Sequence, residues 1–104
     1  MDVVILEKVP VALRGELTRW LIEVKTGVYA GHVSARVRDK LWMKCVQNKR
    51  IGGVIQLWST NTEQHFKMRM EGDTSRIIVE EEGLQLIKIP GEFKKAIRIK
   101  RQIN

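Results

Sequence analysis

The chain has 104 residues, with 19 Lys and Arg against 12 Asp and Glu and a formal net charge of +7. Apolar residues make up 43% and charged residues 30%, which are ordinary globular values and exclude an intrinsically disordered chain. The length suits one domain whose thin margin of stability would benefit from a second copy. The positive charge attracts polyanions, but it fits a merely soluble basic surface equally well.

Cysteine usage and hydropathy indicate the compartment. The single cysteine, Cys45, cannot form an internal disulfide, and no cluster of cysteines and histidines offers a zinc site. The first residues contain no basic leader, and no apolar run approaches the length that spans a bilayer. We therefore expect a cytoplasmic protein in a reducing environment, without membrane association.

The N-terminal part of the chain predicts a strand, a helix and a second strand. Residues 3–6 form a continuous apolar run, which is typical of a central strand buried on both faces. After Pro10, apolar residues recur at helical spacing and predict a helix that continues to Lys25. These residues are Leu13, Leu17, Trp20, Leu21 and Val24. A short strand-like segment, 28–30, follows between two glycines.

A second helix is predicted from residue 35 to about residue 48, because apolar residues recur along one face. Ser34 is a suitable N-cap. Basic residues stack at four-residue intervals on another face. They are Arg36, Lys40 and Lys44. The helix is therefore expected to carry a cationic stripe.

The remaining segments are predicted to be strands joined by a turn and a loop. Residues 54–59 favour a buried strand with Trp58 as its largest side chain. In residues 66–70 apolar and basic residues alternate, which is typical of a strand with one face exposed to solvent. Residues 71–83 contain glycines and an acidic triplet and are predicted to form a long loop before a last strand, 84–89. Helices alternating with strands, followed by consecutive strands, predict an α+β fold, a two-layer sandwich of the ferredoxin-like kind.

Two blocks of residues have the order and spacing of a known family. The first block is Val9-Pro10, Leu13-Arg14-Gly15, Trp20-Leu21, Glu23-Val24, Gly27-Val28-Tyr29, Gly31 and Val33-Ser34-Ala35. The second block is Arg38, Trp42, Gly53, residues 58–63, Gly72 and Gly83-Leu84. In these residues the chain resembles, to about Pro90, the type I-E form of CRISPR-associated protein two, the Cas2 family.

This resemblance implies that residues 1–90 form a ferredoxin-like homodimer between two dimers of the integrase, CRISPR-associated protein one. That complex captures a short double-stranded DNA and inserts it into the repeat array. In type I-E members the integrase carries the catalysis, so the resemblance implies a structural DNA-binding subunit of spacer acquisition that requires no cofactor. The basic segment 91–104 would be a C-terminal extension, a linker, or the start of a fused exonuclease-like domain.

The resemblance also implies which residues contact DNA. Arg14 on the first helix, Arg36 and Arg38 at the start of the second, and Arg76 in the predicted loop match basic positions that grip the duplex. Arginine suits this task because its planar fork can bind a phosphate through two hydrogen bonds. A solvated helix face with incidental charge is the alternative interpretation.

Two positions depart from the family pattern. Ala12 and Ser75 stand where the best-known pattern is basic. We therefore expect a weaker grip on the DNA backbone at these positions, or a grip supplied by neighbours such as Lys40.

Carboxylates keep a second function open, that of a metal-dependent endonuclease acting on phosphodiester bonds of RNA or DNA. Glu7 ends the first strand where the family often keeps an acidic residue near the dimer axis, so two copies could share Mg²⁺. Glu63 and Glu82 match acidic positions that have also been considered catalytic in the type I-E form. For each of them, a solvated or salt-bridged carboxylate is the alternative.

The tryptophans bear on a third function, an unrelated basic domain that binds RNA. Trp20, Trp42 and Trp58 lie on predicted apolar faces, which favours core packing over stacking with bases. No exposed aromatic pair on a strand is evident for binding single-stranded bases, so this alternative is the weakest of the three.

Overall fold

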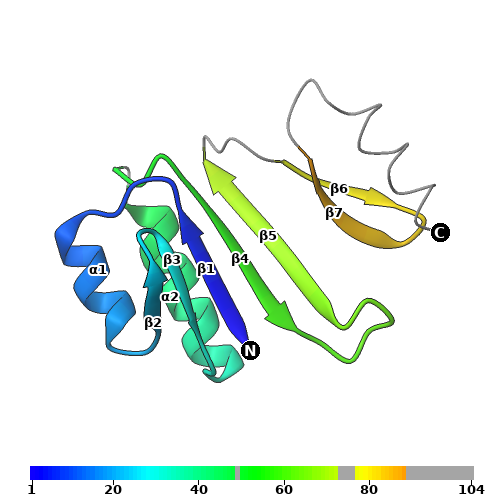
Figure 1. The fold of residues 1–104 in the computed structure, drawn as a ribbon, viewed down its shortest axis with the longest axis horizontal. Helices are drawn as coiled ribbons and strands as arrows, with labels where there is room; N and C mark the ends of the chain where they lie inside the picture. The colour runs from blue at the N-terminus through cyan, green and yellow to red at the C-terminus, as the bar shows by residue number, and fades with distance from the viewer. Residues whose placement is uncertain (49, 73–76, 89–104) are drawn as a thin grey trace. The chain divides into compact units, whose positions relative to one another are not determined.

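The computed structural model describes residues 1–48, 50–72 and 77–88, and the chain divides into two compact units, residues 1–74 and 75–104. The elements of the first unit are β1 (Asp2–Leu6), α1 (Val11–Thr18), β2 (Ile22–Lys25), β3 (Val28–Gly31), α2 (Ala35–Gln47), β4 (Gly53–Ser59) and β5 (Phe66–Gly72) (Figure 1). Those of the second unit are β6 (Ile77–Glu81) and β7 (Leu84–Lys88). Each unit is described by itself below.

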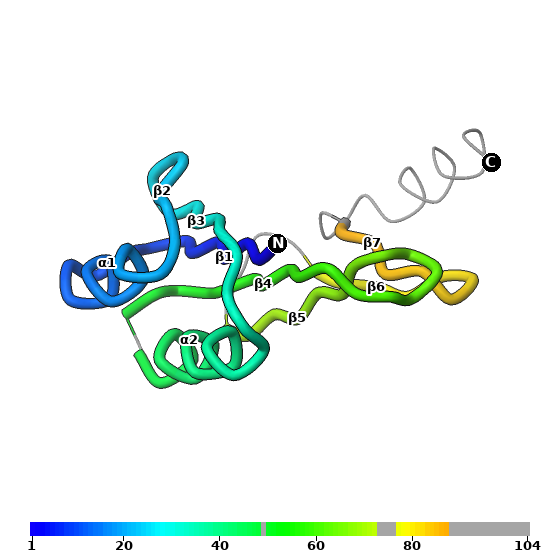
Figure 2. Tube along the Cα trace, turned by 90° about the horizontal axis from the view of Figure 1, so that it is seen from below, coloured from blue at the N-terminus to red at the C-terminus, as the bar shows by residue number. Residues whose placement is uncertain are grey.

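The first unit is an antiparallel sheet with two helices packed against it. The strand order is β2-β3-β1-β4-β5, and every neighbouring pair is antiparallel. Figure 2 shows α2 in a layer of its own, below β4 in that view. The connection β1-α1-β2-β3-α2-β4 with this strand order is consistent with a ferredoxin-like arrangement, to which β5 adds an edge strand. The predicted α+β class is confirmed.

The core lies between the sheet and the helices. Its members are Val4, Leu6, Leu13, Leu17, Leu21, Tyr29, Leu41, Cys45, Ile51 and Val54. β1 is central in the sheet, as predicted, but its burial alternates: Val4 and Leu6 are buried, whereas Val3 and Ile5 are only half-buried. The prediction of a strand buried on both faces is therefore confirmed for the face toward the helices, while the opposite face is only half-buried.

The first helix is shorter than its periodicity predicted. It ends at Thr18, whose hydroxyl donates a hydrogen bond to the Arg14 carbonyl oxygen at 2.9 Å, and residues 22–25 form β2 instead of continuing the helix to Lys25. The β-branched residues of this segment favour a strand, and pairing with β3 satisfies its backbone. Trp20 is 45% exposed, so the prediction that it packs into the core is wrong.

The second helix agrees with its prediction. The Ser34 hydroxyl oxygen accepts a hydrogen bond from the Val37 N–H at 3.2 Å, which confirms the predicted N-cap. Cys45 is buried in the core, and burial raises the pKa of its thiol to about 11. The thiol is therefore protonated at neutral pH, as expected of a small buried side chain.

The described part of the second unit is an antiparallel hairpin. Its second strand, β7, agrees with the predicted last strand, whereas β6 lies where the sequence predicted a long loop. β6 and β7 pair with Glu81 opposite Leu84. Between them, Glu82 and Gly83 have φ angles of 54° and 80°, the left-handed pair that a tight type I′ turn requires. Residues 77–79 are β-branched and suit a strand. The acidic triplet concealed this signal, and the loop prediction is wrong here.

Several predictions concern residues outside those that the structure describes. Arg76, Ser75 and the segment 91–104 belong to this group, so the domain boundary placed after residue 90 stays a prediction. Within the described ranges, no helix is long and apolar enough to cross a membrane.

Candidate nucleic-acid interface

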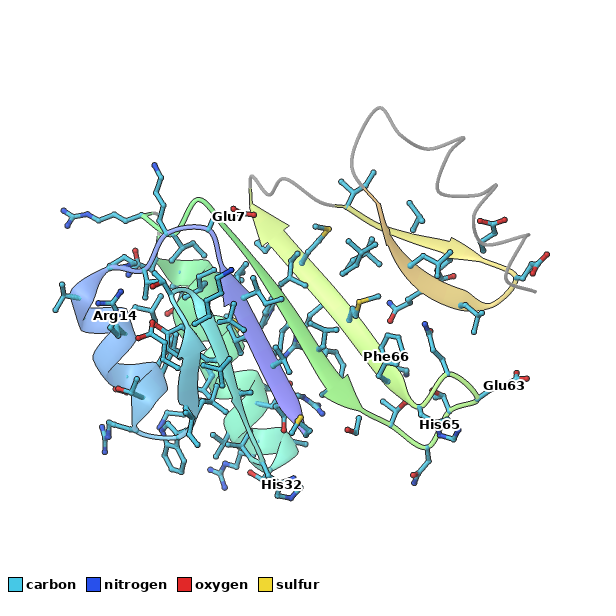
Figure 3. All side chains as sticks on the ribbon, viewed as in Figure 1. Glu7, Arg14, His32, Glu63, His65 and Phe66 are labelled. Atoms are coloured by element: carbon cyan, nitrogen blue, oxygen red, sulfur yellow. The ribbon has the colours of Figure 1, made fainter. Side chains whose placement is uncertain are left out.

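Arg14 projects from α1 and is held by an acidic residue of β2 (Figure 3). Its Nε lies 3.4 Å from Glu23 Oε2, and its side chain is 44% exposed. The same Glu23 oxygen accepts hydrogen bonds from the Tyr29 hydroxyl at 2.7 Å and from the Gly27 N–H at 3.5 Å. Tyr29 is fully buried. The carboxylate is therefore anchored in the fold, while much of the guanidinium stays open to solvent.

These contacts shift the ionisation of all three side chains. The hydrogen bond from Tyr29, aided by the Gly27 N–H and by Arg14, holds the pKa of Glu23 below its ordinary value. The interaction with Tyr29 and the charge of Glu23 raise the pKa of Arg14. Burial, together with the bond to Glu23, raises the pKa of Tyr29. At neutral pH the group therefore contains an ionised Glu23, a cationic Arg14 and a neutral tyrosine.

The predicted cationic stripe on α2 is only partly open. Arg36 and Lys40 are exposed, and among the residues that the structure describes neither side chain has a hydrogen-bonding or ionic partner. Lys44, the third member, lies 3.5 Å from Glu16 of α1. Two of the three charges are therefore available to an anion.

Arg38, on the same helix, is in a different environment. Its guanidinium carbon lies 4.6 Å from the centroid of the Trp58 ring, and its Nε donates a hydrogen bond to Asp39 Oδ1 at 3.2 Å. Its side chain is only 19% exposed. Arg69 of β5 approaches the same ring at 4.9 Å and the Trp42 ring at 4.6 Å. Trp42 packs against the core, as predicted, and also against Arg69, whereas Trp58 is half-buried and contacts the guanidinium groups of Arg38 and Arg69.

Hydrogen bonds complete this cluster. Arg69 Nη2 donates to Asp39 Oδ1 at 2.9 Å and Arg69 Nε donates to Gln56 Oε1 at 2.8 Å. Gln56 Nε2 in turn donates to the Arg38 carbonyl oxygen at 3.1 Å. The bond from Arg69, followed by that from Arg38, holds the pKa of Asp39 below its ordinary value. We refer to these residues as the arginine–tryptophan cluster: Arg38, Asp39, Trp42, Gln56, Trp58 and Arg69.

The chain matches the sequence model of a known protein family. The model of a CRISPR-associated protein family, Cas_Cas2CT1978, matches residues 1–86. The chain belongs to this family. It is a Cas2 family of the type I-E kind, so the resemblance seen in the sequence is confirmed. Membership implies a role in CRISPR adaptation.

In this Cas2-family chain, the arginines predicted to contact DNA are of two kinds. Arg14 and Arg36 offer exposed guanidinium groups. The Arg38 guanidinium lies over the Trp58 ring and forms an ion pair with Asp39. Their contact with DNA stays a prediction, as does that of Arg76 outside the described residues.

Arg69 was not predicted as a functional residue from the sequence. It alternates with Met68 and Met70, which placed it on the wet face of the predicted strand without distinguishing it from its neighbours. Its importance depends on the register of β4 and β5, which sets it opposite Gln56. The side chain then reaches Asp39 on α2.

The candidate catalytic carboxylates lie far apart along the chain. Glu7 follows β1 at one end of the sheet, and Glu63 lies in the β4–β5 turn at the other end (Figure 3). Glu82 lies in the β6–β7 turn of the second unit. Across the described residues, no group of three or more His, Cys, Asp or Glu could hold a metal ion. Magnesium accepts one or two carboxylates with water; a site shared between Glu7 residues of two copies stays a prediction.

Proposed function

We propose that this chain is a structural, DNA-binding subunit of the CRISPR spacer acquisition complex. It bridges integrase dimers and holds the incoming duplex through its backbone phosphates. The observation that supports this is the pair of exposed guanidinium groups on two helices, Arg14 on α1 and Arg36 on α2, in a Cas2-family protein. Arginines on rigid elements can bind phosphates through two parallel hydrogen bonds.

Phosphate contacts fix the position of a duplex without reading its sequence. The net charge of +7 supplies a favourable long-range field for such a partner. Binding is therefore nearly independent of base sequence and requires no cofactor. Each neutralised phosphate releases condensed counterions, so log affinity falls with log salt by roughly 0.9 per contact.

The proposal includes a homodimer, because the sheet face that turns away from the helices is apolar. Its members along the neighbouring strands β1, β4 and β5 are Val3, Ile5, Ile55, Leu57, Met68 and Met70. Ile55 and Met68 are already buried within the chain, whereas Val3, Ile5 and Leu57 are half-buried, so a second copy can complete the cover of this face. Sedimentation at micromolar concentration should show two subunits, and a clean monomer would contradict this part of the proposal.

The grip on DNA is tested by titrating duplex binding with salt. Arg36→Ala should weaken binding and lower the salt slope by about 0.9 per subunit that contacts a phosphate. Lys67→Ala is the control, since Lys67 is an exposed cation on β5. Binding should also be equal for two unrelated sequences. An Arg36→Ala protein that stays folded with the wild-type slope would refute the backbone grip at this residue.

The nuclease alternative is tested with the same complex. Glu7→Ala should still support spacer insertion when it is combined with the integrase and a duplex, because the integrase carries the transesterification. Wild-type protein incubated with RNA or DNA and Mg²⁺ provides the direct assay. Loss of insertion in Glu7→Ala, with dimer and complex intact, or cleavage that depends on Glu7 and Mg²⁺, would favour the endonuclease function.

A further inference from the structure

An open hollow lies between the start of α1 and the end of α2. It has two adjoining parts, with volumes of 470 Å³ and 630 Å³, which share Ala12, Asn48 and Arg50 in their walls. Lys44 lines the first part and Lys8 lines the second. Among the described residues, neither Arg14, Arg36 and Arg38 nor the arginine–tryptophan cluster contributes to these walls.

The charge in the walls of the hollow is positive. Lys8 and Arg50 are exposed, and the described residues provide neither side chain with a hydrogen-bonding or ionic partner. Of the described residues in the walls, Glu16 alone is acidic, and its carboxylate is already compensated by Lys44 at 3.5 Å and by Arg19 at 3.6 Å. Two uncompensated cations from separate segments therefore line one hollow.

The backbone ties these two segments together. The Lys8 N–H donates a hydrogen bond to the Ile51 carbonyl oxygen at 2.9 Å, and the Arg50 N–H donates one to Asn48 Oδ1 at 3.0 Å. Ile51 is 5% exposed and belongs to the core. Both cations are therefore next to an anchored point of the backbone, which limits how far apart they can move.

We propose that this hollow is an additional binding site for backbone phosphates of nucleic acid, with Lys8 and Arg50 as the cations that hold them. This inference rests on the proposed function, because it extends the phosphate-binding surface of Arg14 to the beginning of the same helix. Pro10, Val11 and Ala12 form an uncharged part of the wall, against which a deoxyribose can pack. Arg50 supplies a planar guanidinium group that can donate two hydrogen bonds to a phosphate, and Lys8 supplies a compact ammonium charge.

The hollow is open to solvent, and this suits a continuous backbone that passes over it. A free phosphate or nucleotide presents the same chemistry to the cations. The two sources differ in one measurable property: contacts with a duplex add to the salt dependence of its binding, whereas a site for a small anion leaves that dependence unchanged.

The test compares full-length wild type with the double variant Lys8→Ala/Arg50→Ala in salt titrations of duplex binding. Because the double variant neutralises two fewer phosphates, the salt slope should fall by about 1.8 for each subunit that binds the duplex. The charge-matched control is Lys25→Ala/Lys67→Ala, which removes two exposed cations outside the hollow and should change the slope much less. Unchanged melting temperatures establish that both variants are folded, and Lys8→Arg/Arg50→Lys should keep the wild-type slope.

Each result is decisive. A wild-type slope in Lys8→Ala/Arg50→Ala, together with a reduced slope in Arg36→Ala, refutes the hollow as a duplex site and leaves the proposed function standing. Equal reductions in the double variant and its control also refute it, because the effect is then one of net charge. Inorganic phosphate that shifts the NMR signals of Lys8 and Arg50, without a slope change in the variant, shows a small-anion site instead. Absence of duplex binding by wild type refutes the proposed function together with this inference.

Discussion

Arg14 and Arg38 are both predicted to contact DNA, but the structure surrounds their guanidinium groups differently. Arg14 meets one carboxylate, Glu23, and its side chain is 44% exposed. Arg38 meets Asp39 and lies over the Trp58 ring at 4.6 Å, with 19% of its side chain exposed. The first arginine can therefore bind a phosphate without leaving its place, whereas the second has to break interactions within the protein.

This difference has an energetic cause. A cation over an indole ring gains about 0.5 kcal/mol at an exposed site and about 2 kcal/mol where water is excluded. Arg38 is mostly enclosed, so this energy contributes to the fold and opposes rearrangement toward a ligand. We therefore expect a basic residue at such a position to contact DNA only where tertiary contacts leave its guanidinium open.

The largest effect is expected for Trp58→Ala, which removes the ring that Arg38 and Arg69 share. Because Trp58 is half-buried, the free energy of unfolding should fall by about 2–3 kcal/mol, less than for a fully buried tryptophan. Urea denaturation measures this change. Trp20→Ala is the matched control at a 45% exposed site and should cost less than about 1 kcal/mol. Equal destabilisation of the two variants would contradict a structural role for the cluster.

Alanine substitutions at Arg14 and Arg38 should separate affinity from stability. Arg14→Ala should reduce duplex affinity about tenfold, with a smaller salt slope and little change in melting temperature. Arg38→Ala should lower the free energy of unfolding by about 1 kcal/mol and reduce the salt slope less. Duplex titrations and urea denaturation on the same preparations measure both quantities. A slope reduction in Arg38→Ala as large as that in Arg14→Ala would show that Arg38 binds the backbone despite its enclosure.

Tyr29→Phe should release Glu23 from its strongest hydrogen bond. The pKa of Glu23 should rise toward its ordinary value, and loss of the bond should lower the free energy of unfolding at neutral pH.

The sign of the pH dependence follows from the direction of the shift. The folded-state pKa of Glu23 lies below its unfolded value, so the contribution to stability is complete above an unfolded pKa near 4 and is lost as the pH falls through the folded pKa. Denaturation between about pH 2 and pH 7 should therefore show a shallower acid loss for Tyr29→Phe than for wild type. NMR titration of Glu23 provides the second measurement, and an unshifted pKa would contradict the assignment.

The smallest effect is expected for Asp39→Asn. This change removes the negative charge between Arg38 and Arg69 and should raise duplex affinity about twofold, because the local field becomes more positive. Glu71→Gln, at an exposed position of β5, removes a negative charge elsewhere. An equal gain in both variants would show that only net charge matters and that Asp39 does not mask the cluster locally.

Local patterns predicted the elements whose periodicity was unambiguous. The α2 helix has an apolar face, a serine cap and no competing signal, and it forms as predicted with the Ser34 hydroxyl at the Val37 N–H. The end of α1 was mispredicted because Trp20 and Val24 continue a helical spacing by coincidence, while pairing with β3 makes the segment a strand. β6 was missed because its acidic triplet resembles a loop. In both errors a strand partner elsewhere in the chain decided the structure.

The sequence by itself determined the family, the α+β class and the presence of a basic surface with Arg14, Arg36 and Arg38 on its helices. Only the tertiary structure decided which of these cations are open. Asp39 and Arg69 are 30 residues apart in the sequence, and Trp58 reaches Arg38 from another element. Their meeting depends on the register of β4 with β5 and on the packing of α2 against the sheet, which no local pattern encodes. A cationic side chain that is already paired within the protein has less charge and fewer hydrogen bonds to offer a ligand.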